Sequence, residues 1–106
     1  MSLRQEKVSE LIKRYAAVFF ESETDGSSLI TITDCQASES LKHVRILISV
    51  FPTKKEEATL EFLKSKTMDF RNYLKTKLKM KFIPQVDVEI DKGEKNRQRI
   101  EELLKQ

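Results

Sequence analysis

The sequence predicts an α+β domain of two layers, and the order of its hydrophobic patterns is the main reason. A long helical pattern comes first, and two alternating stretches follow it; two further helical patterns and a last alternating stretch complete the series. Helices packed on one face of a small three-stranded sheet satisfy this order. A chain of 106 residues, 39% of them hydrophobic, has the size of one core. We therefore expect a single domain over residues 1–106.

The first half of the chain predicts a helix and a hairpin. Apolar side chains recur at helical spacing between about Leu3 and Glu21, namely Val8, Leu11, Ile12, Tyr15 and Phe19. Residues 22–28 are rich in serine and contain Asp25-Gly26, a turn composition that ends the helix. Residues 29–35 and 44–51 alternate between apolar and other side chains, which predicts two strands. The short polar connection over residues 36–41 permits an antiparallel hairpin.

Two consecutive helices are expected next. Pro52 ends the second strand, and Thr53 is expected to cap a helix from about Lys54 to Ser65. A break near Lys66-Thr67, with Thr67 as a second candidate cap, separates this helix from another that runs on to Lys81. The apolar residues Phe70, Tyr73, Leu74 and Leu78 give the second of these helices its period.

A third strand and a short tail close the chain. Val86, Val88 and Ile90 alternate with polar residues, which predicts a strand over residues 84–91 with one solvated face. Residues 91–93 are expected to turn, and residues 93–106 to form a short C-terminal helical tail with a narrow apolar stripe. The order helix, strand, strand, helix, helix, strand is also that of the type II KH domain, an RNA-binding fold.

Basic charge is concentrated in one stretch of the chain. The whole chain has a net charge of +3, whereas residues 64–81 contain seven basic residues and one acid, Asp69. Arg71, Lys75 and Lys79 are four residues apart and share one face of the predicted helix. Such a stripe indicates a polyanionic partner, usually nucleic acid, while a merely solvated helix face is the alternative interpretation.

Aromatic residues offer a second candidate feature. Phe70 falls on the apolar period and is expected in the core, as are Phe19, Phe20 and Phe51. Tyr73 is the better candidate for a surface ring that stacks on a base.

The residue patterns of the sequence give little indication of catalysis, metal binding or membrane insertion. Cys35 and His43 could be neighbours across the hairpin, but no third residue is placed to orient the imidazole. The acids at positions 87, 89 and 91 follow from strand alternation. A single cysteine excludes an internal disulfide, and no apolar run approaches the length of a membrane span. We expect no catalytic residue, no metal, no cofactor and no small-molecule substrate, and a cytoplasmic location because nothing resembles a secretory signal.

An ordered set of motifs resembles the ribosome-binding factor A family. The resemblance covers most of the chain and is carried by residues 4–12 (RQEKVSELI), 29–33 (LITIT), 44–50 (VRILISV), 70–74 (FRNYL) and 78–86 (LKMKFIPQV), followed by Asp91 and residues 100–104 (IEELL). There are departures from the family pattern. A small element ending in glycine is usual between the second and third helices, where this chain has Lys66-Thr67-Met68. An aspartate is usual where Ser40 stands, and a serine where Gly93 stands.

The resemblance implies a type II KH-like domain that acts without being an enzyme. Its partners would be the free small (30S) ribosomal subunit and the ribosomal RNA (rRNA) of that subunit, contacted near the decoding region. It would assist late 30S maturation and rRNA processing in the cytoplasm, as a monomer. The RNA-binding residues expected from the resemblance and the basic stripe are Arg4, Lys7, Arg45, Lys66, Arg71, Lys75, Lys79 and Lys81. The alternative is a KH-like protein-interaction module that does not bind RNA.

Overall fold

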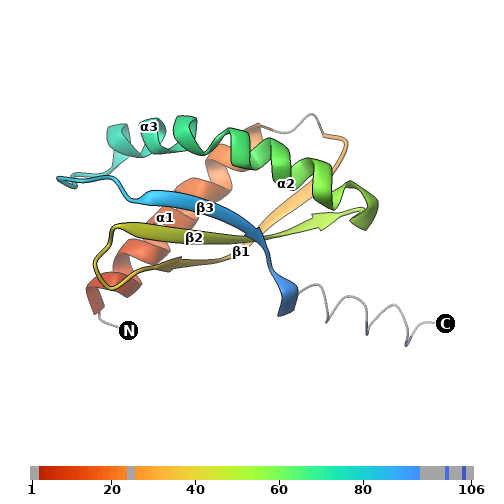
Figure 1. The fold of residues 1–106 in the computed structure, drawn as a ribbon, viewed down its shortest axis with the longest axis horizontal. Helices are drawn as coiled ribbons and strands as arrows, with labels where there is room; N and C mark the ends of the chain where they lie inside the picture. The colour runs from red at the N-terminus through yellow and green to blue at the C-terminus, as the bar shows by residue number, and fades with distance from the viewer. Residues whose placement is uncertain (1–2, 24–25, 94–99, 101–103, 105–106) are drawn as a thin grey trace.

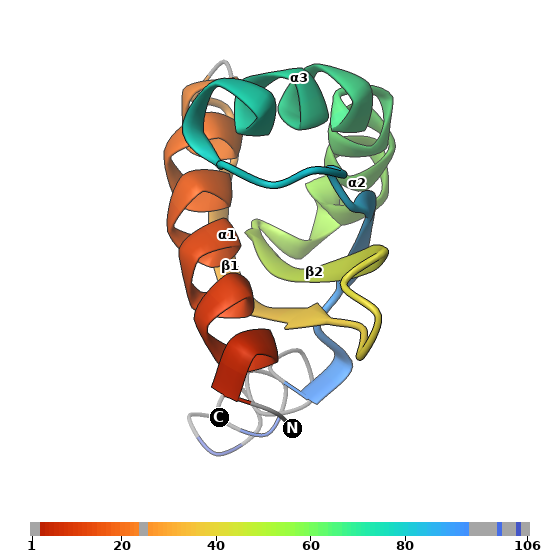
Figure 2. The same cartoon turned by 90° about the vertical axis from the view of Figure 1, so that its left-hand side faces the viewer.

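The computed structural model describes residues 3–23, 26–93, 100 and 104. Its elements are α1 (Leu3–Ser22), β1 (Leu29–Ala37), β2 (His43–Phe51), the short 3-10 helix η1 (Thr53–Lys55), α2 (Glu56–Ser65), α3 (Thr67–Lys77) and β3 (Gln85–Ile90). The α-helices lie together on one face of the sheet, and the other face carries none of these labelled helices (Figures 1 and 2). The predicted two-layer α+β architecture is confirmed.

The sheet has the order β1-β2-β3, with β2 in the middle. β1 and β2 form the predicted antiparallel pair, whereas β2 and β3 are parallel. A parallel pair needs a crossover connection, and α2 and α3 supply it by running back across the helical face. This crossover returns the chain to the start of β2, where Gln85 N–H donates to the Lys42 carbonyl over 2.8 Å.

The pleat of β2 separates core from surface. Val44, Ile46, Ile48 and Val50 point into the helical layer and are buried. Phe51 stands at an odd-numbered position, so its side chain points to the other face of the sheet. It is 64% exposed, and its predicted place in the core is wrong. It shares the outer face with Arg45, because residues an even number apart lie on the same side of a strand.

β1 continues two residues beyond its predicted end because it contains a bulge. The register with β2 shifts between Ile32 and Asp34, and the buried positions change there from even to odd numbers. Cys35 and Ala37 consequently face the core. The Asp34 carboxylate accepts the Cys35 N–H over 2.8 Å and satisfies the irregular backbone.

Neither threonine caps a helix as predicted. Thr53 lies inside η1, and no side chain caps the N-terminus of α2. The Thr67 hydroxyl donates instead to the Lys64 carbonyl over 3.0 Å, so it closes the end of α2. Lys66 is the boundary residue of both helices, which confirms the predicted break.

The helix α3 ends at Lys77, four residues before its predicted end at Lys81. Leu78 is buried, as the helical period requires, but its backbone is extended with φ −108° and ψ 136°. Its N–H still donates to the Leu74 carbonyl over 2.8 Å. Lys79 and Lys81 therefore lie in a connecting segment, residues 78–84, and do not continue the helical face of Arg71 and Lys75.

The C-terminal part of the chain follows the prediction in β3 and differs from it just after that strand. Alternation along β3 is confirmed, since Val86 and Val88 are buried and Asp87 and Glu89 are exposed. Lys92 and Gly93 are helical and do not form the expected turn, and Ile100 and Leu104 are also helical. The remaining residues of the predicted C-terminal helix lie outside the described part of the chain.

An aromatic cluster fixes α3 against α1. The rings of Phe20 and Phe70 are fully buried with their centroids 4.9 Å apart, and the Phe19 ring lies 5.4 Å from both Phe70 and Tyr73. Burial of one such side chain contributes roughly 1.5–3 kcal/mol. The core positions predicted for Phe20 and Phe70 are confirmed, and the segment that leaves α3 starts from a fixed point.

Within the described residues, no helix is long and apolar enough to cross a membrane.

Candidate nucleic-acid interface

Residues 78–84, here called the basic loop, connect α3 to β3 and present their side chains in two directions. Leu78 and Pro84 are buried, and Met80 and Ile83 pack against the core. Lys79, Lys81 and Phe82 point outward and are exposed. The loop is thus anchored at both ends and along its inner side, although it belongs to no helix or strand.

Arg71 holds this loop in place. Its Nε donates to the Pro84 carbonyl over 2.9 Å, and its Nη2 donates to the Ile83 carbonyl over 3.1 Å. A guanidinium fork suits adjacent carbonyl oxygens because its donors are fixed in one plane. The sequence hypothesis placed Arg71 among the RNA-binding residues, whereas its guanidinium is directed to the backbone of the basic loop.

Two hollows flank the basic loop. The first, of about 290 Å³, lies between the start of α1, the turn from β1 to β2 and the loop, and Arg4, Lys42, Lys79 and Lys81 contribute to its lining. The second, of about 400 Å³, lies between the loop and α3 and is lined in part by Lys75 and Lys81. Met80, Lys81 and Phe82 belong to both. Figure 2 faces this end of the molecule, with the loop crossing between α3 and the sheet.

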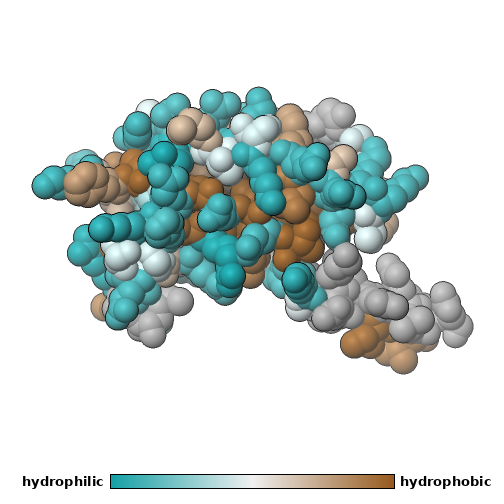
Figure 3. Space-filling view, in the orientation of Figure 1, coloured by the Kyte–Doolittle hydropathy of each residue, from teal (hydrophilic) through white to brown (hydrophobic). Residues whose placement is uncertain are grey.

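Six cations line these hollows. Arg71 is one of them, and its guanidinium donates to the backbone of the basic loop. We call the other five the loop-end surface: Arg4, Lys42, Lys75, Lys79 and Lys81. All five are exposed. Within the described part of the chain, none of them forms an ion pair with a carboxylate. Glu39 is the acid that lines the first hollow with them. In the space-filling view this end shows hydrophilic side chains around a hydrophobic patch (Figure 3, left).

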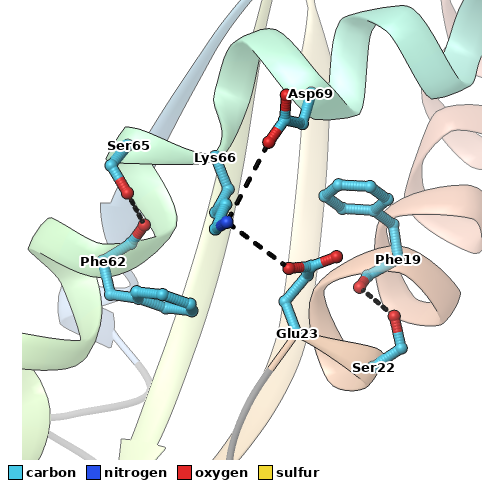
Figure 4. A network of polar contacts seen from close by, with 7 residues as sticks. All are labelled: Phe19, Ser22, Glu23, Phe62, Ser65, Lys66 and Asp69. Carbon is cyan, nitrogen blue, oxygen red and sulfur yellow. Dashed lines mark hydrogen bonds and ion pairs between the residues drawn. The ribbon is translucent and has the colours of Figure 1, made fainter.

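Lys66 lies apart from the loop-end surface, at the other end of α3. Its ammonium is 3.9 Å from a Glu23 carboxylate oxygen and 4.0 Å from one of Asp69, as Figure 4 shows. It also lies 5.6 Å from the centre of the Phe62 ring. The backbone at Lys66 has φ −99° and ψ 2°, which residues other than glycine can adopt. The break between the helices therefore needs no glycine, and two carboxylates offset the charge of Lys66.

Arg45 and Lys7 also lie outside the loop-end surface. Arg45 is on the outer face of the sheet, where its Nε is 3.2 Å from a Glu89 carboxylate oxygen and its Nη2 donates to Gln36 over 2.8 Å. Lys7 is exposed on α1, one turn after Arg4. The structure thus brings together Arg4, Lys75, Lys79 and Lys81 from the predicted set, with Arg71 behind them.

Sequence reasoning missed Lys42 and Phe82. Lys42 precedes β2 in a polar turn, and only the parallel pairing of β3 brings it next to the basic loop. Phe82 is 71% exposed, while Tyr73, the predicted surface ring, is half-buried in the aromatic cluster. The sequence did contain one signal for Phe82. The residue comes directly after Lys81, so an aromatic ring stands next to a basic side chain, and Ile83-Pro84 follows it.

The hypothetical pair of Cys35 and His43 does not form. Cys35 is opposite Ile46 in the sheet and buried, whereas His43 is exposed at the start of β2. Burial raises the pKa of the Cys35 thiol to about 12, and the nearby Asp34 charge acts in the same direction. The thiol is protonated at neutral pH and is a poor nucleophile. No group of acids, histidine or cysteine suited to hold a metal ion occurs among the described residues.

Comparison with known proteins identifies the family that this chain resembles. The family model described as ribosome-binding factor A matches residues 4–104. The chain is 35% identical to ribosome-binding factor A of Chlorobaculum parvum over 109 residues, covering 99% of this chain and 91% of that protein. It is 31% identical to the protein of the same name from a Synechococcus species, with 97% and 79% covered.

Solved structures show the same fold. The crystal structure of ribosome-binding factor A from Thermus thermophilus superposes with a TM-score of 0.73 at 17% identity, covering 81% of this chain and 93% of that one. A homology model of the Thermus thermophilus factor, as fitted into the cryo-electron microscopy map of a 30S–factor complex, gives 0.69 at 18% identity, with 79% and 91% covered.

Proposed function

The chain belongs to the ribosome-binding factor A family, and we propose that it binds the free small ribosomal subunit through the rRNA of that subunit. In this proposal it assists late 30S maturation and rRNA processing. It acts in the cytoplasm as a monomer, without catalysis and without a cofactor. The relatives are named for ribosome binding, and one structural neighbour was fitted into the map of a 30S complex.

The loop-end surface is the observation that carries the RNA-binding part of the proposal. Its cations come from α1, the β1–β2 turn, α3 and the basic loop, and none of them forms an ion pair with a carboxylate among the described residues. Phosphate oxygens supply the missing negative charge, and each contact releases counterions from the RNA. Such contacts position a protein on RNA without reading its sequence.

The mechanism needs binding and release only. Arg71 and the buried residues of the basic loop hold the backbone that carries Lys79 and Lys81 in place before RNA arrives, so little backbone ordering is needed on binding. The docked protein then holds a late-folding region of the rRNA until processing is complete. Electrostatic attachment is reversible, which suits a factor that leaves the finished subunit.

Co-sedimentation across a salt series tests the proposal. Purified protein is pelleted with free small subunits, with assembled ribosomes and with naked small-subunit rRNA. We expect salt-sensitive pelleting that is strongest with free small subunits. Lys79→Glu combined with Lys81→Glu should abolish it.

The control reverses two lysines beyond the far end of β2, Lys54→Glu with Lys55→Glu, which changes the net charge equally. Control and wild type should pellet alike. Equal losses in both double variants would mean that only the net charge matters, and the loop-end surface would be rejected. In cells lacking the protein, unprocessed rRNA should accumulate, and only the wild type and the control should restore processing.

A second candidate function has one observation in its favour. Leu29 and Phe51 are opposite each other in the sheet, 66% and 64% exposed, and form an apolar pair on the outer face. This pair suits a protein-interaction module. Association through it would change little with salt, whereas phosphate contacts weaken steeply. Salt-insensitive pelleting that is lost in Leu29→Ser with Phe51→Ser would favour this second function.

A further inference from the structure

Phe82 is an exposed aromatic ring in a charged surrounding. It is 71% exposed, although a buried phenylalanine would contribute roughly 1.5–3 kcal/mol to stability. Its neighbours on the inner side of the basic loop, Met80 and Ile83, pack against the core. The ring therefore does not serve the core, and the fold turns it outward between residues that are anchored.

The ring is also held in position. Arg71 fixes the backbone immediately after it, through the Ile83 and Pro84 carbonyls. The Lys81 ammonium lies 5.5 Å from the centre of the Phe82 ring, within the range of a cation–π contact. An aromatic group that is ordered before binding loses little conformational entropy when a ligand stacks on it.

Charge around the ring defines the ligand. Both hollows beside Phe82 are lined by members of the loop-end surface, Lys79 and Lys81 on one side and Lys75 and Lys81 on the other. A flat apolar ring bordered by cations matches a nucleotide, whose base stacks and whose phosphates pair with lysines. A base inside a duplex is already stacked on its neighbours, so the match is to an unpaired nucleotide.

We propose that Phe82 stacks on an unpaired base of the bound RNA, so that the loop-end surface prefers single-stranded nucleotides over duplex. This inference rests on the proposed function and adds the class of RNA that the site takes.

The test uses the absence of tryptophan from the chain. Phe82→Trp introduces a single indole, whose fluorescence is quenched when a base stacks on it. Phe51→Trp is the matched control, because Phe51 is 64% exposed and lies at the far end of β2. At about 3.3 Å per residue it is roughly 26 Å along the strand from His43, the first residue of β2. Each variant is titrated with a 12-nucleotide oligoadenylate and with an RNA duplex of the same length.

We expect quenching of the Phe82→Trp protein by the single strand and much less by the duplex, with no change in Phe51→Trp. Phe82→Leu should weaken single-strand binding about fivefold or more, the size typical of one stacked base, while Phe51→Leu leaves it unchanged. Both exposed positions tolerate leucine, and equal urea midpoints for the variants and the wild type verify that each has folded.

The results separate this inference from the proposed function. If the Lys79 and Lys81 reversals abolish subunit binding but Phe82→Trp is not quenched and Phe82→Leu binds as the wild type does, stacking is rejected and the function stands. Equal losses on single strand and duplex would also reject stacking. If the wild-type protein binds neither RNA nor subunits at low salt, both proposals fail.

Discussion

At the scale of single residues, Arg71 supports the proposed RNA site through the backbone of the basic loop, to which its guanidinium donates. Arg71→Lys keeps the charge but loses the planar fork that reaches the Ile83 and Pro84 carbonyls. We expect a loss of about 1–3 kcal/mol in the free energy of unfolding, measured by urea denaturation, together with weaker RNA binding. Lys75→Arg is the control on the same helix face and should change neither. Unchanged stability in Arg71→Lys would show that the basic loop does not depend on this clamp.

Cys35 gives a second prediction, which concerns pH. Burial raises the pKa of its thiol from 9.0 to about 12, so the unfolded chain releases the proton first as the pH rises. The stability that this shift contributes is complete below pH 9 and is lost as the pH rises toward 12. The unfolding free energy of the wild type should therefore fall more steeply over this range than that of Cys35→Ala.

At neutral pH iodoacetamide should label Cys35 in urea but not in the native protein; rapid native labelling would contradict its burial.

At the scale of elements, the break between α2 and α3 shows that a turn need not contain glycine. Lys66 has a negative φ, so glycine there would relieve no strain, and it would add freedom to the unfolded chain. Lys66→Gly should lower the unfolding free energy by about 1 kcal/mol, as measured by urea denaturation. Lys66→Ala separates the lost ion pairs with Glu23 and Asp69 from the backbone effect and should cost less. A more stable Lys66→Gly protein would reveal strain at this residue.

Most elements were predictable because their burial follows one period. The alternation of β2 and the apolar spacing of α1 specify those elements in the sequence alone. The errors occur where the pattern of buried residues does not match the backbone conformation. Leu78 keeps the helical period with an extended backbone, so α3 was predicted too long. The bulge near Thr33 reverses the alternation, so β1 was predicted too short. Such local departures depend on tertiary contacts, which a single sequence pattern does not contain.

At the scale of the whole molecule, the candidate site is a product of topology. Lys75, Lys79 and Lys81 were predictable as members of one basic stretch. Lys42 could not be added to them, because its place depends on the parallel pairing of β3 beside β2. Lys66 lies at the opposite end of α3, where its ammonium is close to the Glu23 carboxylate. The charge stripe in the sequence is therefore divided in the fold, and only part of it reaches the loop-end surface.

The size of the loop-end surface predicts how binding depends on salt. If all five of its cations contact phosphates of single-stranded RNA, log affinity should fall with log salt with a slope of about −3.5, at roughly 0.7 per contact. Lys79→Gln with Lys81→Gln removes two contacts, and the slope should become about −2. Lys54→Gln with Lys55→Gln removes the same charge beyond the far end of β2 and should leave the slope unchanged. Fluorescence anisotropy of a labelled oligonucleotide between about 50 and about 300 mM salt measures all three slopes. Equal slopes in the two double variants would mean that RNA senses the whole basic molecule, and no part of its surface would then be the site.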